Sequence, residues 1–170
     1  MSDATIRDAI ERLGAAISGD PGKARARNAP ASARLTEDLK CEVTGPHGER
    51  FVTDMPPAMG GTATGPGPGW LLRGALASCT ATVVAMRAAK LGVTLQMLEV
   101  AVESESDNRG LLGLDDSISA GLGALRTRVK IRGNAESHIL RGIVLWAEAH
   151  SPVGCTVRQG AASALEIIVD

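Results

Sequence analysis

Residues 70–91, WLLRGALASCTATVVAMRAAKL, are the stretch of sequence that decides the fold. Apolar and small residues occupy nearly every position around the helical period, so the stretch predicts one long helix buried on most of its surface. Arg73, Arg87 and Lys90 interrupt it, and no run of about 18 uncharged apolar residues exists. We therefore expect a central core helix that ends at Gly92, with no membrane span.

The segment before this helix changes period. Apolar residues alternate over residues 39–44 and again over 51–55, and Gly45–Gly48 lie between them. This pattern predicts a β-hairpin. Cys41 falls on the inward face of its first strand and is expected to be an inert core residue. Residues 56–69, PPAMGGTATGPGPG, predict a long loop without regular structure, and loops of this length are often functional.

The segment after the helix predicts two more strands, over residues 98–103 and 125–132. The outward face of the first is acidic and that of the second is basic, so we expect an antiparallel pair in which opposite charges face each other. Asn134 is expected to cap a helix that runs to Ala149. Its predicted buried side consists of Ile139, Leu140, Ile143, Val144 and Ala147.

The two ends of the chain complete the pattern. Residues 1–20 predict an amphipathic helix, and residues 21–33 a basic, exposed linker. Ser151-Pro152 predicts the start of a short helix, because serine caps helices and proline suits their first position. Residues 165–169 predict a last strand. Without regular βαβ alternation, the fold class is α+β.

Composition excludes several classes of function. Eighteen Lys and Arg against nineteen Asp and Glu give a net charge of −1, too balanced for a nucleic-acid or membrane-surface partner. Three cysteines make no disulfide framework, and no signal peptide is visible, so the cytoplasm is the expected location. The three histidines are dispersed and the Gly-rich loop lacks the P-loop spacing. We expect neither a metal nor another cofactor.

Two cysteines are candidates for chemistry. Cys79 lies in the middle of the long helix, where it is either a core residue or a nucleophile with Arg73 as a cationic partner. Cys155 falls in the first turn of the short helix, where free N–H groups favour a thiolate. The residues alone leave both interpretations open.

Four motifs resemble the OsmC/Ohr family of osmotically induced and organic-hydroperoxide-resistance proteins. They are PPAMGG at 56–61, GPGP at 65–68 leading into Leu71-Leu72, ALASCT at 75–80 and SPV at 151–153. The resemblance covers about residues 35–170 and leaves 1–34, the helix and basic linker, as the extension of one OsmC-like subgroup. It implies antiparallel sheets around a long buried central helix, in an intertwined homodimer with sites at the subunit interface.

The resemblance also implies a chemistry. In the family, a peroxidatic cysteine on the central helix becomes a sulfenic acid, and a resolving cysteine closes a disulfide. Cys79 matches the peroxidatic position. Ser151 stands where the resolving cysteine is expected, and Cys155 follows one helical turn later. The family's glutamate corresponds to Gly69, and its arginine has only Arg50 as a nearby candidate.

Two functions therefore stand side by side. The first is a thiol-dependent redox protein that reduces organic hydroperoxides through Cys79, with Cys155 as resolving thiol and an external thiol as reductant. In it, Arg73 or Arg50 stabilises the thiolate. The alternative is a non-catalytic homodimer that binds a small apolar ligand in the interface cleft. Replacement of the glutamate by Gly69 favours the second function, and two retained thiols favour the first.

Overall fold

The computed structural model describes residues 3–169 of the chain, which fall into two compact units. The first, called the core unit, contains residues 3–10, 75–102 and 127–169. The second, called the sheet unit, contains residues 11–74 and 103–126. The long helix α2 (Pro68–Lys90) passes from the second unit into the first without a break.

The sheet unit is built on a three-stranded antiparallel sheet in the order β1 (Ser32–Glu37), β2 (Lys40–Thr44) and β3 (Arg50–Thr53). The β2–β3 hairpin confirms the predicted one, with Cys41 opposite Thr53. Strand β1 was not predicted, because it lies at the end of the expected linker. All six of its residues are exposed, so it carries no apolar face for a sequence pattern to reveal.

Short helical segments connect these elements. A 3₁₀ turn, η1, covers Pro21–Ala24, and a second, η2, covers Pro57–Met59 inside the predicted loop. Helix α3 (Asn108–Leu111) begins behind Asp107, whose side chain accepts the N–H of Arg109. Helix α2 starts at Pro68, two residues before the predicted start at Trp70, because proline is well placed in a first helical turn.

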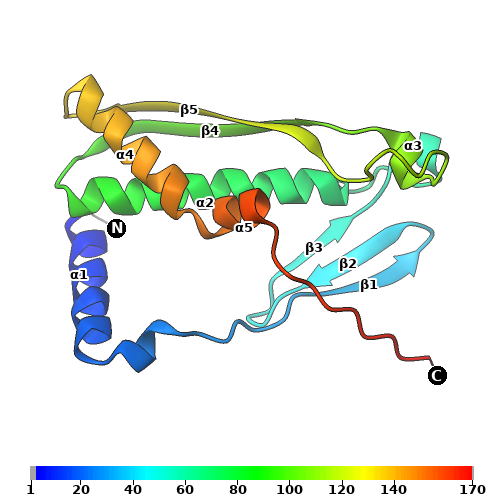
Figure 1. Ribbon diagram of the computed structural model, residues 1–170, viewed down its shortest axis with the longest axis horizontal. Coiled ribbons are helices and arrows are strands. Elements are labelled where there is room, and N and C mark those ends of the chain that lie inside the picture. The colour runs from blue at the N-terminus through cyan, green and yellow to red at the C-terminus, as the bar shows by residue number, and fades with distance from the viewer. Residues whose placement is uncertain (1–2, 170) are drawn as a thin grey trace. The chain divides into compact units, whose positions relative to one another are not determined.

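The core unit packs helix α4 (Ser137–His150) and α2 against the strand pair β4 (Leu95–Glu105) and β5 (Gly123–Gly133) (Figure 1). Lys130 on β5 binds Glu99 on β4 at 3.3 Å, which confirms the predicted pairing of a basic face with an acidic one. Apolar side chains from α2, α4 and the segment before β4 form the core: Val84, Ala88, Val93, Leu140, Ile143 and Ala147.

Three expectations for this unit were wrong. Asn134 does not cap α4, whose N-cap is Glu136. The side-chain oxygen of Asn134 instead accepts a hydrogen bond from the backbone N–H of Thr94 at 2.8 Å. Ile139 is 39% exposed, because it lies beside the buried stripe of α4 and not on it. Residues 165–169 form no strand, since no neighbouring strand supplies the ladder that a strand requires.

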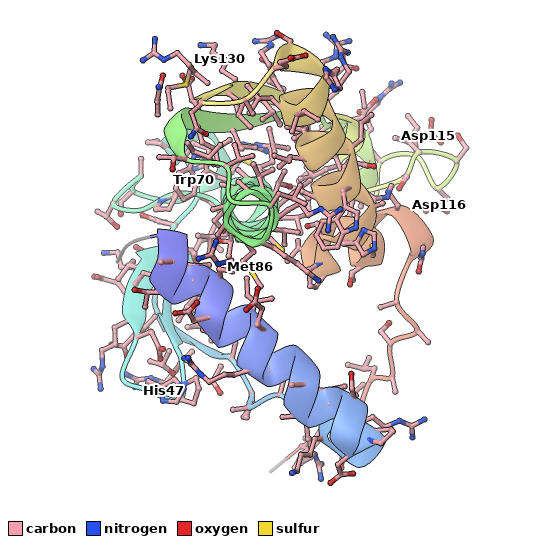
Figure 2. The ribbon with its side chains drawn as sticks, turned by 90° about the vertical axis from the view of Figure 1, so that its left-hand side faces the viewer. His47, Trp70, Met86, Asp115, Asp116 and Lys130 are labelled. Carbon is pink, nitrogen blue, oxygen red and sulfur yellow. The ribbon has the colours of Figure 1, made fainter. Side chains whose placement is uncertain are left out.

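Helix α2 is the central helix that the sequence predicts, but a single chain buries only one stripe of it. The buried residues are Leu76, Thr80, Val84, Ala88 and Ala89. Trp70 and Leu72 are 55% and 41% exposed. Met86, 39% exposed, projects from α2 on the side of helix α1 (Asp3–Gly19), as Figure 2 shows. By length and composition alone, α2 would also suit a membrane span.

Candidate functional site

Cys79 and Ser151 meet in the core unit although 72 positions separate them in sequence. The Ser151 hydroxyl donates a hydrogen bond to the Cys79 sulfur at 3.2 Å. Ser151 is 1% exposed, whereas Cys79 is half-buried. The contact places a fixed hydroxyl donor against the sulfur on which negative charge develops in thiol chemistry.

Ser151 is held in place by the junction between two helices. It follows α4 directly and is the N-cap of α5 (Pro152–Gln159), as the sequence predicts. Its hydroxyl oxygen accepts the N–H of Gly154 at 3.1 Å while its proton points to Cys79. The first turn of α5 therefore polarises the hydroxyl that contacts the sulfur.

Gly154 keeps this junction tight. A Cβ atom at Gly154 would lie 3.1 Å from the Ser151 hydroxyl oxygen and 3.1 Å from a guanidinium nitrogen of Arg158. Both distances are shorter than ordinary van der Waals contact. A side chain here would press on Ser151, so a glycine at this position helps to hold the Ser151–Cys79 contact.

Cys155 makes a different set of contacts. Its thiol donates to the carbonyl oxygen of Ala149 at 3.3 Å, and Arg158 donates to its sulfur at 3.5 Å. Arg158 is itself fixed by Glu148, at 2.6 Å. Within the described residues, Cys79 and Cys155 are both free thiols. Cys155 thus has a cationic neighbour, Arg158, of the kind that the sequence suggested for Cys79 in Arg73.

Arg73 and Gly69 lie near each other in the first turns of α2. Arg73 donates to the hydroxyl of Ser104 at 3.1 Å. A Cβ atom at Gly69 would lie 3.8 Å from Arg73 and 3.5 Å from Leu122, which is ordinary contact. A carboxylate at position 69 would therefore stand beside Arg73, and in this chain the position has no side chain.

Arg50 is engaged on the surface of the sheet. Its guanidinium binds Glu42 at 3.2 Å, and Arg34 binds the same carboxylate at 3.2 Å. The Arg50 side chain is 71% exposed. Cys41, on the neighbouring strand, is half-buried, which fits a residue on the covered face of the hairpin.

Asp54 organises the Gly/Pro loop, and sequence reasoning missed it. This residue is 2% exposed, and its carboxylate accepts five hydrogen bonds from Met55, Thr62 and Thr64 at 2.7 to 3.1 Å. The backbone N–H of Thr64 and the hydroxyl of Thr62 contribute most to holding the pKa of Asp54 far below its usual value, and burial opposes them. The Thr-x-Thr spacing at 62–64 was the available signal.

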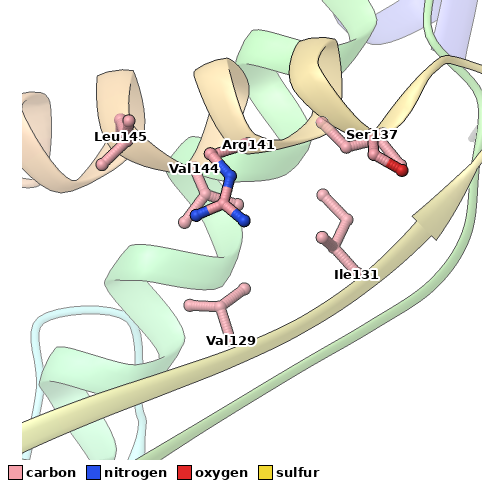
Figure 3. Close-up of a pocket in the computed structure, with 7 residues that line it drawn as sticks. Val129, Ile131, Ser137, Arg141, Val144 and Leu145 are labelled. Atoms are coloured by element: carbon pink, nitrogen blue, oxygen red, sulfur yellow. The ribbon is translucent and has the colours of Figure 1, made fainter.

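Two cavities lie in the core unit. One, of about 340 Å³, is lined by β5 and α4, with Arg141 and Val144 facing Val129 and Ile131 (Figure 3). The other, of about 260 Å³, includes Val83, Trp146 and Pro152 in its wall. Among the described residues, no group of three His, Cys, Asp or Glu side chains comes together as metal ligands would.

Solved structures with this fold come from several bacteria. An OsmC-like protein from Mycoplasma pneumoniae superimposes with a TM-score of 0.67 at 19% identity, covering 80% of this chain and 90% of its own. An organic hydroperoxide resistance protein OsmC from Legionella pneumophila superimposes with a TM-score of 0.62 at 16% identity. The match covers 79% of this chain and 91% of the Legionella protein. OhrB, the organic hydroperoxide resistance protein of Bacillus subtilis, superimposes with a TM-score of 0.56 at 19% identity. The match covers 79% of this chain and 93% of OhrB.

The family assignment comes from the sequence itself. No curated protein matches the chain. The family model described as OsmC-like protein matches residues 61–166, more than half of the chain. The matched region contains Cys79, Ser151 and Cys155, and helix α1 precedes it as an extension. The chain belongs to the OsmC family, and it has the α+β fold of antiparallel sheets and a central helix that the family's solved structures share.

Proposed function

We propose that this OsmC-family protein reduces organic hydroperoxides, with Cys79 as the nucleophile. The contact between the Ser151 hydroxyl and the Cys79 sulfur carries the proposal, since it gives a half-buried thiol a buried, oriented donor. Structural relatives named organic hydroperoxide resistance proteins support the same chemistry. A homodimer in the cytoplasm is the setting that we propose for it.

The first step oxidises Cys79 and reduces the peroxide. The sulfur attacks the terminal peroxide oxygen, so that an S–O bond forms as the O–O bond breaks. The alkoxide that leaves takes up the proton released by the thiol, and the products are Cys79 sulfenic acid and an alcohol. Ser151 holds the sulfur in its attacking position and stabilises the charge on it.

The second step returns the sulfur to a thiol. An attacking thiol forms a disulfide with Cys79 and releases the sulfenic oxygen as water, and a further thiol reduces that disulfide. Cys155 is the resolving thiol of the proposal, and Arg158 contacts its sulfur at 3.5 Å. An external monothiol or dithiol supplies the electrons. Arg73 or Arg50 stays in the proposal as the residue that stabilises the thiolate.

Peptide mapping after oxidation tests the proposal. Stoichiometric cumene hydroperoxide should consume Cys79 before Cys41 and Cys155, giving a sulfenic acid that dimedone traps or a disulfide to Cys155. Cys79→Ser should abolish peroxide consumption in the presence of dithiothreitol, while Cys41→Ser should leave it unchanged. If Cys79 stays reduced in the folded protein, the enzymatic function is excluded.

The second candidate is a homodimer that binds a small apolar ligand without catalysis. Gly69 favours it, because the family's glutamate position has no carboxylate here. The two functions differ in a single measurement. With excess reductant present, an enzyme should consume many equivalents of cumene hydroperoxide per protein. A binding protein should leave the hydroperoxide concentration unchanged.

A further inference from the structure

The smaller cavity of the core unit has apolar walls and a cationic side. Its lining residues are Ile10, Val83, Met86, Arg87, Lys90, Trp146, His150 and Pro152. None of these residues is acidic. At about 260 Å³, the cavity is slightly below the roughly 300–1,000 Å³ of most ligand sites, so it suits a small molecule.

Arg87 is the unusual member of this wall. Its Nε atom is buried and, among the described residues, has no hydrogen-bond partner. The guanidinium carbon lies 4.6 Å from the centroid of the Trp146 ring, a cation–π contact that fixes the group but satisfies none of its donors. The lining supplies Arg87 and Lys90 with no carboxylate to balance them, which makes an anion a favourable occupant.

Two contacts hold the aromatic side of the cavity. The ring of His150 stacks on that of Trp146, with 3.9 Å between the ring centroids and an angle of 11° between the ring planes. His150 Nδ1 also donates a hydrogen bond to the Trp146 carbonyl oxygen at 2.7 Å. Helix α1 adds Ile10 from the other side, so the N-terminal extension closes part of the wall. Preformed walls bind with less loss of conformational freedom than walls that must order.

We propose that this cavity binds a small apolar carboxylate, with its hydrocarbon part against Met86, Val83 and Trp146 and its carboxylate on Arg87. The apolar walls select the hydrocarbon, and the guanidinium, with Lys90 at the exposed rim, selects the negative head group. The site does not depend on the redox chemistry of Cys79, since no step of that chemistry is needed for binding.

Calorimetric titration with sodium octanoate and with 1-octanol tests this site, because the two probes share a chain and differ in charge. Octanoate should bind the full-length protein at pH 7 about 10- to 100-fold more tightly than octanol, the range expected for a charge-assisted hydrogen bond. Arg87→Met, similar in length but neutral, should remove this preference. Arg141→Met, which changes an arginine of the other cavity, should retain it.

Three outcomes would overturn the proposal. They are equal binding of octanol and octanoate, equal loss of octanoate binding in Arg87→Met and Arg141→Met, and no octanoate binding because a second copy of the chain covers the cavity. Cys79→Ser should bind octanoate as the wild type does. Failure of the carboxylate site is thereby distinguished from failure of the proposed peroxidase activity.

Discussion

Ser151 joins helices α4 and α5, and its hydroxyl group also contacts the Cys79 sulfur. Ser151→Ala should oxidise at Cys79 about three- to tenfold more slowly, because it loses a hydrogen bond of roughly 1 kcal/mol to the sulfur. The loss of the α5 cap should also lower the free energy of unfolding by about 1 kcal/mol. Stopped-flow oxidation and urea unfolding measure the two effects. Ser78→Ala is the matched control, because it removes an exposed hydroxyl from α2, the helix that contains Cys79. Equal oxidation rates of Cys79 in the two variants would contradict the role of Ser151.

The carboxylate of Asp54 is a second single-residue feature, and it contributes to the free energy of unfolding. Its pKa is lowered in the folded protein, so its ionised form stabilises the fold fully above the unfolded pKa of about 4, and this contribution is lost as pH falls below that value. Asp54→Asn should be less stable at pH 7 than the wild type, and the difference should shrink from about pH 4 downward. Urea unfolding across pH 2–7 measures this. Asp116→Asn, at an exposed carboxylate, is the control for removal of one negative charge.

At the scale of elements, the first turn of α2 begins with a favourable proline but lacks other residues that stabilise a helix start. It contains no acidic residue, and Gly69 lies in it. Gly69→Glu should raise the free energy of unfolding by about 1 kcal/mol, because glutamate is a better helix former than glycine and its charge favours the helix N-terminus beside Arg73. Gly69→Gln separates the two causes, since it gains only the helix propensity. A destabilised Gly69→Glu would show that Leu122 leaves no room.

At the scale of the whole molecule, the apolar surface that one chain leaves exposed predicts a dimer. Leu72 on α2 is exposed, and so are the apolar side chains of the C-terminal segment, Leu165, Ile167, Ile168 and Val169, at 74% to 87%. Surfaces of this kind are rarely left to solvent. Sedimentation velocity at micromolar concentration should find a dimer, and Leu72→Asp or Ile167→Asp should weaken it. A stable folded monomer would contradict the prediction.

Elements held by local contacts were predictable from sequence. These elements depend on residues that are close together in the sequence. They are the β2–β3 hairpin, the helices α1, α2 and α4, and the Ser151 cap of α5. Their signals are periodicity and cap residues, which a single sequence displays. The family motifs, at 56–80 and 151–153, added the fold and the expectation that Cys79 is the nucleophile.

Contacts between distant parts of the chain were decided only by the tertiary structure. Asn134 binds Thr94 and caps no helix, and β1 pairs without an apolar face. Residues 165–169 are rich in the β-branched residues that strands favour but form no strand. The Ser151–Cys79 contact and the wall that Arg87 shares with Trp146 likewise join separate segments. The local pattern of a sequence states which face of an element is apolar or polar. Which partner meets that face depends on how the elements pack, because hydrogen bonds and apolar contacts are satisfied by whatever group the fold brings within reach.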